Sequence, residues 1–148
     1  MIDVIDLKKT FGDLEVLKGI NVTINKGDIV VVIGPSGSGK STFLRCLNCM
    51  EDPTSGSIIF NGVDIADMRV DINIHRRHMG MVFQHFNLFN NMTVIENIMM
   101  APVYVRCKEL KKAKRKGTLA PDAPKTKAEI KAQAREEALE LLRRIGLE

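Results

Sequence analysis

The stretch "GPSGSGKST", residues 34–42, contains three glycines, three serines and one lysine within nine residues. It fits the pattern Gly-x4-Gly-Lys-Ser/Thr, which requires a chain able to curl tightly. In such a loop several backbone N–H groups converge on an anion, and the helix that follows directs its N-terminal dipole at the same point. The stretch therefore predicts a loop that binds the phosphates of a nucleotide.

The flanking residues support this interpretation. The unbroken apolar run Ile29–Ile33 predicts a strand buried on both faces, and residues 40–50 have apolar residues at helical spacing. A flexible Gly/Ser linker is the alternative, but a linker does not join a core strand to a core helix. Lys40 is expected to reach the β- and γ-phosphates, and Ser41 to offer its hydroxyl to Mg²⁺. The residues expected to wrap the phosphates are Gly34, Pro35, Ser36, Gly37, Ser38, Gly39, Lys40, Ser41 and Thr42.

The composition is that of an ordinary globular domain. The chain has 148 residues, of which 45% are apolar and 27% charged. Its longest apolar run is far shorter than the roughly 18 residues needed to span a bilayer, and no signal-peptide pattern opens the sequence. With three cysteines, an odd number, we expect a reducing, cytoplasmic setting.

Several further elements are expected from local patterns. Asn61-Gly62 predicts a tight turn between two short strands. Thr93 with Glu96 predicts the capped start of a short helix that runs through about Met100. Thr126 with Glu129 predicts the capped start of a longer helix that ends before Gly146. The expected strands span residues 2–7, 20–24, 57–65 and 79–83. The apolar face of the last helix comprises Ile130, Ala134, Ala138, Leu141, Leu142 and Ile145.

The net charge of +4 is concentrated in one segment. Residues 106–116 hold seven lysines and arginines against one acidic residue, and the following residues are rich in Gly and Pro. The interpretation for residues 106–126 is a solvated, inserted loop or linker; contact with anionic lipid headgroups or with nucleic acid is the alternative. Little aromatic interleaving argues against nucleic acid as a partner.

Two smaller clusters are interpreted as structural. Cys46-x-x-Cys49 lies on the helix after the glycine loop, where small residues pack against a sheet rather than bind metal. The run His75, Arg76, Arg77 and His78 lacks a second ligand cluster and is interpreted as a solvated surface.

Three stretches together carry a resemblance to a known family. "LKKTFGDLEVLKGINVTINKGDIVVVIGPSGSGKSTFLRCLN", "PTSGSIIFNG" and "MGMVFQHFNLFNNMTVIENI" resemble the ATP-binding subunit of an ABC transporter, most closely the subunits that serve importers of polar amino acids. The resemblance runs from residue 2 to about 105 and resumes from about 128 to 148. It implies an α/β fold: a P-loop NTPase core of the ABC type (1–105) with an antiparallel β subdomain, the basic segment 106–126, and the start of a helical subdomain (127–148).

The resemblance also implies residue roles and partners. Phe11 takes the position of the aromatic that stacks on adenine. Gln84 takes the position of the glutamine that contacts Mg²⁺ and the attacking water. ATP and Mg²⁺ are the implied ligands. The implied partners are a permease at the inner face of the plasma membrane and a second ATP-binding subunit, with self-association of this chain as a further expectation.

Parts of the family pattern are absent from these 148 residues. They contain no LSGGQ-type signature and no apolar strand that ends in Asp-Glu (the Walker B acids). No histidine takes the place of the switch histidine, because His75, His78 and His85 all precede or adjoin Gln84. We therefore expect weak Mg-ATP binding and negligible hydrolysis by the chain alone, because no general base is present. The alternative is a non-catalytic nucleotide-binding module that associates with a partner. A kinase or GTPase is disfavoured by Phe11 and Gln84, and the guanine-reading Asn-Lys-x-Asp is missing.

Overall fold

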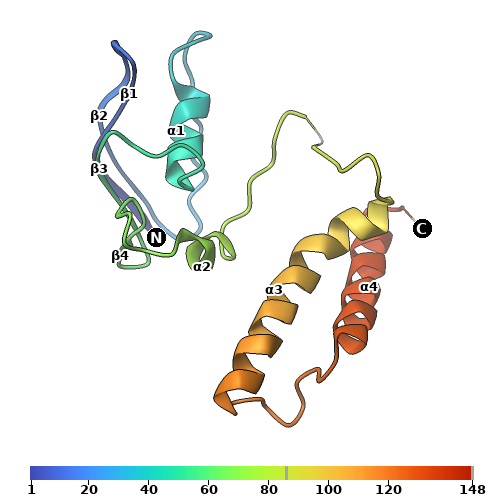
Figure 1. Ribbon diagram of the computed structural model, residues 1–148. Coiled ribbons are helices and arrows are strands. Elements are labelled where there is room, and N and C mark those ends of the chain that lie inside the picture. The colour runs from blue at the N-terminus through green and yellow to red at the C-terminus, as the bar shows by residue number, and fades with distance from the viewer. Residues whose placement is uncertain (86, 148) are drawn as a thin grey trace. The chain divides into compact units, whose positions relative to one another are not determined.

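The computed structural model describes residues 1–85 and 87–147, and the chain divides into two compact units, Met1–Val82 and Phe83–Glu148. The elements of the first unit (Figure 1) are β1 (Ile2–Phe11), β2 (Leu14–Ile24), α1 (Lys40–Leu47), β3 (Ser55–Phe60), β4 (Val63–Asp64) and α2 (Ile72–Arg76). The second unit contains α3 (Val94–Lys116) and α4 (Lys127–Arg144).

The first unit is built on an antiparallel four-stranded sheet in the order β2-β1-β3-β4. β1 and β2 form a hairpin that closes at the pair Phe11 and Leu14. The predicted turn at Asn61-Gly62 is confirmed: both residues have positive φ, 49° and 83°, and they join β3 to β4. The strands expected at 2–7 and 20–24 are therefore parts of longer strands, and the antiparallel β element is confirmed.

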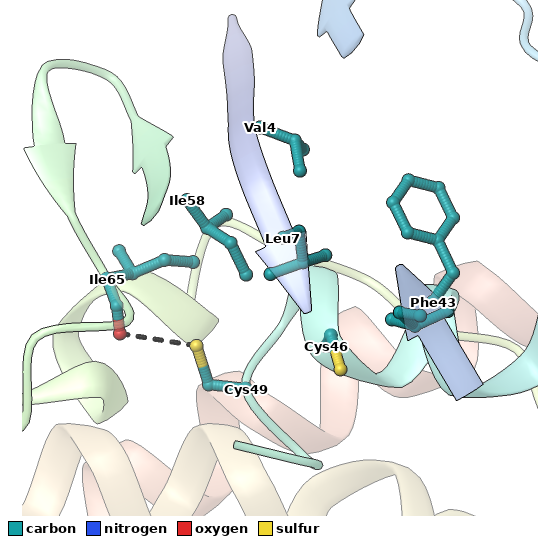
Figure 2. Packing of buried hydrophobic residues seen from close by; sticks show 8 residues of the cluster. Val4, Leu7, Phe43, Cys46, Cys49, Ile58 and Ile65 are labelled. Carbon is teal, nitrogen blue, oxygen red and sulfur yellow. Dashed lines mark hydrogen bonds between the residues drawn. The ribbon is translucent and has the colours of Figure 1, made fainter. Parts of the chain in front are cut away.

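One face of this sheet packs against α1 to form the core (Figure 2). α1 contributes Phe43 and Cys46 to the same buried cluster as Leu7 of β1 and Ile58 of β3. Leu7 and Ile58 are fully buried, and each such side chain contributes about 1.5–3 kcal/mol relative to exposure. The core cluster consists of Val4, Leu7, Leu17, Phe43, Cys46, Cys49, Ile58 and Ile65. This packing fixes α1, and therefore the loop before it, against the sheet.

Two expected strands do not form. Residues 29–33 and 79–83 have no strand geometry, and within residues 1–85 and 87–147 neither segment pairs with a strand. Most of their apolar side chains are open to solvent: Ile29 is 94% exposed and Val82 is 98% exposed, whereas Met79 packs against the core cluster. The predictions were wrong because an apolar run becomes a buried strand only where neighbouring strands satisfy its backbone and cover both its faces.

α3 starts where the sequence predicts but is much longer. Thr93 and Glu96 form a complete capping box. The helix then continues past Met100 and Pro102 to Lys116, and Gly117, with φ 65°, ends it. The first half of the basic segment, residues 106–116, is thus helical rather than a loop, because its residues are good helix formers and cations suit a helix C-terminus. Although α3 has 23 residues, neither it nor any other helix of the described chain is apolar enough to cross a membrane.

α4 packs beside α3 in a helical pair (Figure 1). Its N-cap Thr126 accepts a hydrogen bond from Glu129, and Ile130, Ala134 and Ala138 are buried as expected. Leu141 and Ile145, which were expected on the same apolar face, are exposed. At the C-terminus, Gly146 (φ 73°) donates to the Arg143 carbonyl and Leu147 to the Leu142 carbonyl, which is the Schellman arrangement.

Candidate nucleotide-binding site

The glycine loop runs directly into α1. Within it, the Ser38 amide donates to the Pro35 carbonyl at 3.3 Å, which closes a turn. The first residue of α1 is Lys40, and the helix is anchored one turn later by the buried side chain of Phe43. The positive end of the helix dipole is therefore held at the loop by the same packing that forms the core.

Gly39 brings the loop against the hairpin. It caps α1 with a φ of 86°, a conformation that disfavours any side chain. A Cβ at this position would lie 2.9 Å from Cγ1 of Val16 and 3.1 Å from Cδ2 of Leu17 on β2. Glycine is thus required here twice, for its backbone conformation and for its close approach to β2.

The first turn of α1 is suited to an anion. The N–H groups of Lys40, Ser41 and Thr42 have no acceptor within the helix, because the first intrahelical bond is from the Phe43 amide to the Gly39 carbonyl at 2.8 Å. No acidic residue lies in this turn, and Ser41 is exposed. Convergent N–H donors without a competing carboxylate are what a phosphate group needs.

Lys40 is bound to its own loop. Its ammonium group donates to the carbonyl of Pro35 at 2.7 Å and to that of Gly34 at 2.9 Å, and it lies 3.5 Å from the Ser38 hydroxyl. These contacts hold the positive charge over the loop rather than out in solvent. The lysine thereby adds its charge to the field of the N–H groups that follow it.

The aromatic ring of Phe11 lies on the same hairpin that Gly39 contacts. Phe11 ends β1, pairs with Leu14 on β2 and is 45% exposed. Leu14 is three residues from Leu17, which is about 10 Å along a strand. The structure thus brings the ring and the glycine loop to one end of the hairpin.

A cation lies beside this ring, and the sequence analysis did not predict it. The Lys9 ammonium lies 4.7 Å from the centroid of the Phe11 ring. The signal was present in the sequence, because residues i and i+2 of a strand share a face. Lysine is so often solvated that spacing alone did not single it out.

Gln84 belongs to the second unit, where it is exposed and lies outside the helices. Its predicted contact with Mg²⁺ concerns groups of the first unit, and its role stays a prediction. Of the apolar residues beyond it, Leu88 and Phe89 are exposed, and Phe86 lies outside the described residues.

The two cysteines on and after α1 have the structural character expected. Both are buried and free, and the Cys49 thiol donates to the Ile65 carbonyl at 3.2 Å. Burial is the main reason that the pKa of Cys49 is raised from 9.0 to about 11, and burial likewise raises the pKa of Cys46. Thiolates are therefore disfavoured, and the residues that the structure describes hold no cluster suited to a metal ion.

The basic run after α1 is less solvated than expected. Arg76 donates to the carbonyl oxygens of Asn48 and Cys49 at 3.0 and 2.5 Å, and His75 meets the Phe60 ring edge-on. Arg76 therefore satisfies carbonyls just beyond the C-terminus of α1, at the opposite end from the glycine loop.

Comparison with known families assigns the chain that carries this loop to a family. The family model described as "ABC transporter" matches residues 17–148, most of the chain. The chain belongs to the ABC transporter family.

Relatives within the ABC family agree with this assignment. The arginine transport ATP-binding protein ArtM of Bacillus subtilis is 47% identical over 147 residues, covering 99% of this chain and 52% of ArtM. The glutamine transport ATP-binding protein GlnQ of Geobacillus stearothermophilus is 54% identical over 99 residues, covering 67% of this chain and 41% of GlnQ. The chain thus spans about half the length of the curated relatives it matches, and it corresponds to an N-terminal part of their domain.

Solved structures of an ABC cassette share the fold. The dimeric structure of MJ0796, a bacterial ABC transporter cassette, matches with a TM-score of 0.70 and 28% identity over 97% of this chain and 56% of that one. A second dimeric structure of MJ0796, in a post-hydrolysis state bound to ADP and Pi, matches with a TM-score of 0.61 and 28% identity, over 94% of this chain and 69% of that one. The expected ABC-type P-loop fold is therefore confirmed.

Proposed function

We propose that this chain forms the nucleotide-binding part of an ABC importer subunit that energises uptake of a polar amino acid. The observation that carries the proposal is the glycine loop fixed at the N-terminus of α1, with unpaired N–H groups at Lys40, Ser41 and Thr42. The transport of arginine and glutamine named for the similar proteins supports the substrate class.

The roles proposed for individual residues follow from their chemistry. The loop residues 34–42 bind the phosphates, and Lys40 exchanges its carbonyl contacts for β- and γ-phosphate oxygens. The Ser41 hydroxyl and the Gln84 amide oxygen are hard oxygen ligands of the kind that Mg²⁺ accepts. Phe11 offers its ring to adenine. Mg²⁺ supplies charge neutralisation of the phosphates when bound.

Turnover is a separate question from binding. The sequence contains no apolar run that ends in Asp-Glu, the acidic pair that would polarise an attacking water beside the γ-phosphate, and Gln84, an amide, is not a base. We propose that the chain alone binds Mg-ATP without measurable hydrolysis. Hydrolysis, as proposed, needs the signature and the acidic pair that family members carry beyond this region.

The proposed partners are a permease at the inner face of the plasma membrane and a second ATP-binding subunit. The dimeric state of the MJ0796 cassette supports the second of these. The exposed apolar run 29–33, together with Val82 and Phe83, favours association, including self-association, because such runs are normally covered. These segments also favour the alternative function, a nucleotide-binding module that associates with a partner without turnover.

Calorimetric titration with Mg-ATP tests the proposal. The variant Lys40→Ala should lose most of the affinity, whereas Lys26→Ala, which changes an exposed lysine outside the loop, should not. Phosphate release measured in the same preparations should stay at background. Equal binding by Lys40→Ala would contradict the role of the loop, and steady release abolished by that variant would contradict the absence of turnover.

A further inference from the structure

The Lys9 ammonium is held in a defined place by three groups. It lies 2.7 Å from Oε1 of Glu51, donates to the Asp52 carbonyl at 2.7 Å, and lies over the Phe11 ring at 4.7 Å from its centroid. The side chain of Lys9 is only 12% exposed, far less than that of an ordinary surface lysine. An ammonium group fixed at this distance is attracted by the electron-rich face of the ring.

The partners of Lys9 are connected to the helix that follows the glycine loop. The Met50 and Glu51 amides both donate to the Arg45 carbonyl in the last turn of α1, at 2.9 and 3.3 Å. A few residues further along the chain, Thr54 makes two hydrogen bonds to the backbone of β1. Its amide donates to the Lys8 carbonyl at 2.8 Å, and its hydroxyl accepts from the Thr10 amide at 2.9 Å.

These contacts form a continuous connection between two parts of the candidate site. The glycine loop leads into α1, and the last turn of α1 is hydrogen-bonded to the segment that contains Glu51 and Asp52. Glu51 and Asp52 in turn bind the Lys9 ammonium, which contacts the Phe11 ring. The ring itself is 45% exposed at the end of β1, so its own burial fixes it only in part. The contact with Lys9 is a second restraint on its position.

We propose that Lys9 is a positioning residue for purine stacking: it orients the Phe11 ring and occupies one of its faces, so that the base stacks on the other. The proposal rests on the proposed function, in which Phe11 receives adenine. Fixing the ring in advance lowers the ordering cost of binding, and the ammonium draws electron density toward its own face. Lys9 itself touches neither base nor phosphate.

A role in stability alone is the competing explanation, and the ligand used as probe separates the two. Tripolyphosphate carries the phosphates of ATP without the base. If Lys9 acts through Phe11, its loss affects ATP and leaves tripolyphosphate unchanged. If Lys9 only supports the fold, both ligands lose affinity together.

The experiment is calorimetric titration of the full chain with Mg-ATP and with magnesium tripolyphosphate. Lys9→Met keeps the aliphatic stem and should weaken Mg-ATP binding about two- to fivefold, without changing tripolyphosphate binding. Lys9→Arg should restore ATP affinity. Glu51→Gln, which keeps the lysine but loosens it, should give a smaller loss in the same direction.

Phe11→Ala completes the cycle. In that background, Lys9→Met should cause no further loss of ATP affinity. Equal losses for both ligands, a loss that persists without the ring, or no loss at all in Lys9→Met would overturn the role of Lys9 while leaving the proposed function intact. No effect of Phe11→Ala on ATP binding, or no binding of either ligand by the unchanged chain, would instead overturn the proposed function and the role of Lys9 with it.

Discussion

Gly39 and Val16 are so close that a single methyl group does not fit between them: a Cβ on Gly39 would lie 2.9 Å from Cγ1 of Val16. This contact joins the start of α1 to β2 and so places the glycine loop on the hairpin that ends at Phe11. We therefore expect a side chain at Gly39 to affect both the stability of the chain and the binding of a nucleotide.

The variant Gly39→Ala is expected to destabilise the chain by about 2–4 kcal/mol, because it adds a clash to a left-handed backbone conformation. It should also abolish detectable Mg-ATP binding. Urea unfolding and calorimetry measure the two effects.

Gly62→Ala is the matched control for this prediction. Gly62 has nearly the same φ, 83°, but a Cβ there meets no atom within 4 Å. It should therefore cost only the backbone strain, about 1–2 kcal/mol, and leave binding intact. Equal destabilisation by the two variants would show that the approach to Val16 has no energetic weight.

Arg76→Met should destabilise the first unit by about 1–3 kcal/mol, because two carbonyls beyond the C-terminus of α1 lose charged donors. Arg69→Met is the control: Arg69 pairs with Asp67 on the surface, its side chain is 90% exposed, and its loss should be within about 1 kcal/mol. The comparison is made by urea unfolding. An Arg76 variant no weaker than the Arg69 variant would be the contrary result.

Alkaline pH should destabilise the chain partly through Cys49. Its pKa is 9.0 when exposed and about 11 in the fold, mainly because of burial, so the folded state retains a proton that the unfolded state loses. This contribution to stability is complete below pH 9 and is lost as the pH rises from 9 to 11. Cys49→Ala should thus show a shallower loss of unfolding free energy over that window than the unchanged chain. Parallel pH profiles would contradict the burial of the thiol.

The capping box of α3 predicts a further stability effect. Thr93→Ala removes the hydroxyl that accepts from the Glu96 amide and should cost about 1 kcal/mol in a urea titration followed by circular dichroism. Thr118→Ala, at an exposed threonine just after the same helix, should cost little. A cost that is the same at both positions would argue against the cap.

The sequence predicts local features of this fold well where neighbouring residues alone decide them. The capping box at Thr93, the turn at Asn61-Gly62 and the start of α1 at Lys40 each depend on a few adjacent residues. The run Ile29–Ile33 failed as a predicted strand because strand formation depends on distant partners, which no local pattern supplies. The length of α3 was not predicted: the expected helix ended at about Met100, whereas α3 continues through Pro102 to Lys116.

The candidate site shows the same difference between features set by adjacent residues and features set by distant ones. The glycine loop is predictable because its residue types carry the chemistry themselves. Lys9 was not predicted, since its role depends on Glu51 and Asp52, which lie more than 40 positions away in the sequence. The role of Gln84 stays a prediction, and so do the domain boundaries near residues 105 and 126.

The central claim, that residues 34–42 bind nucleotide phosphates beside Phe11, is tested most directly by following backbone amide and aromatic resonances of the labelled chain by nuclear magnetic resonance during titration with Mg-ATP. We expect the largest amide shifts at Gly37, Gly39, Lys40 and Ser41, with upfield shifts of the Phe11 ring protons as a base stacks on it. Tripolyphosphate should reproduce the first change without the second. Shifts that cluster elsewhere in the chain, or loop amides that stay unchanged at saturating Mg-ATP, would contradict the account.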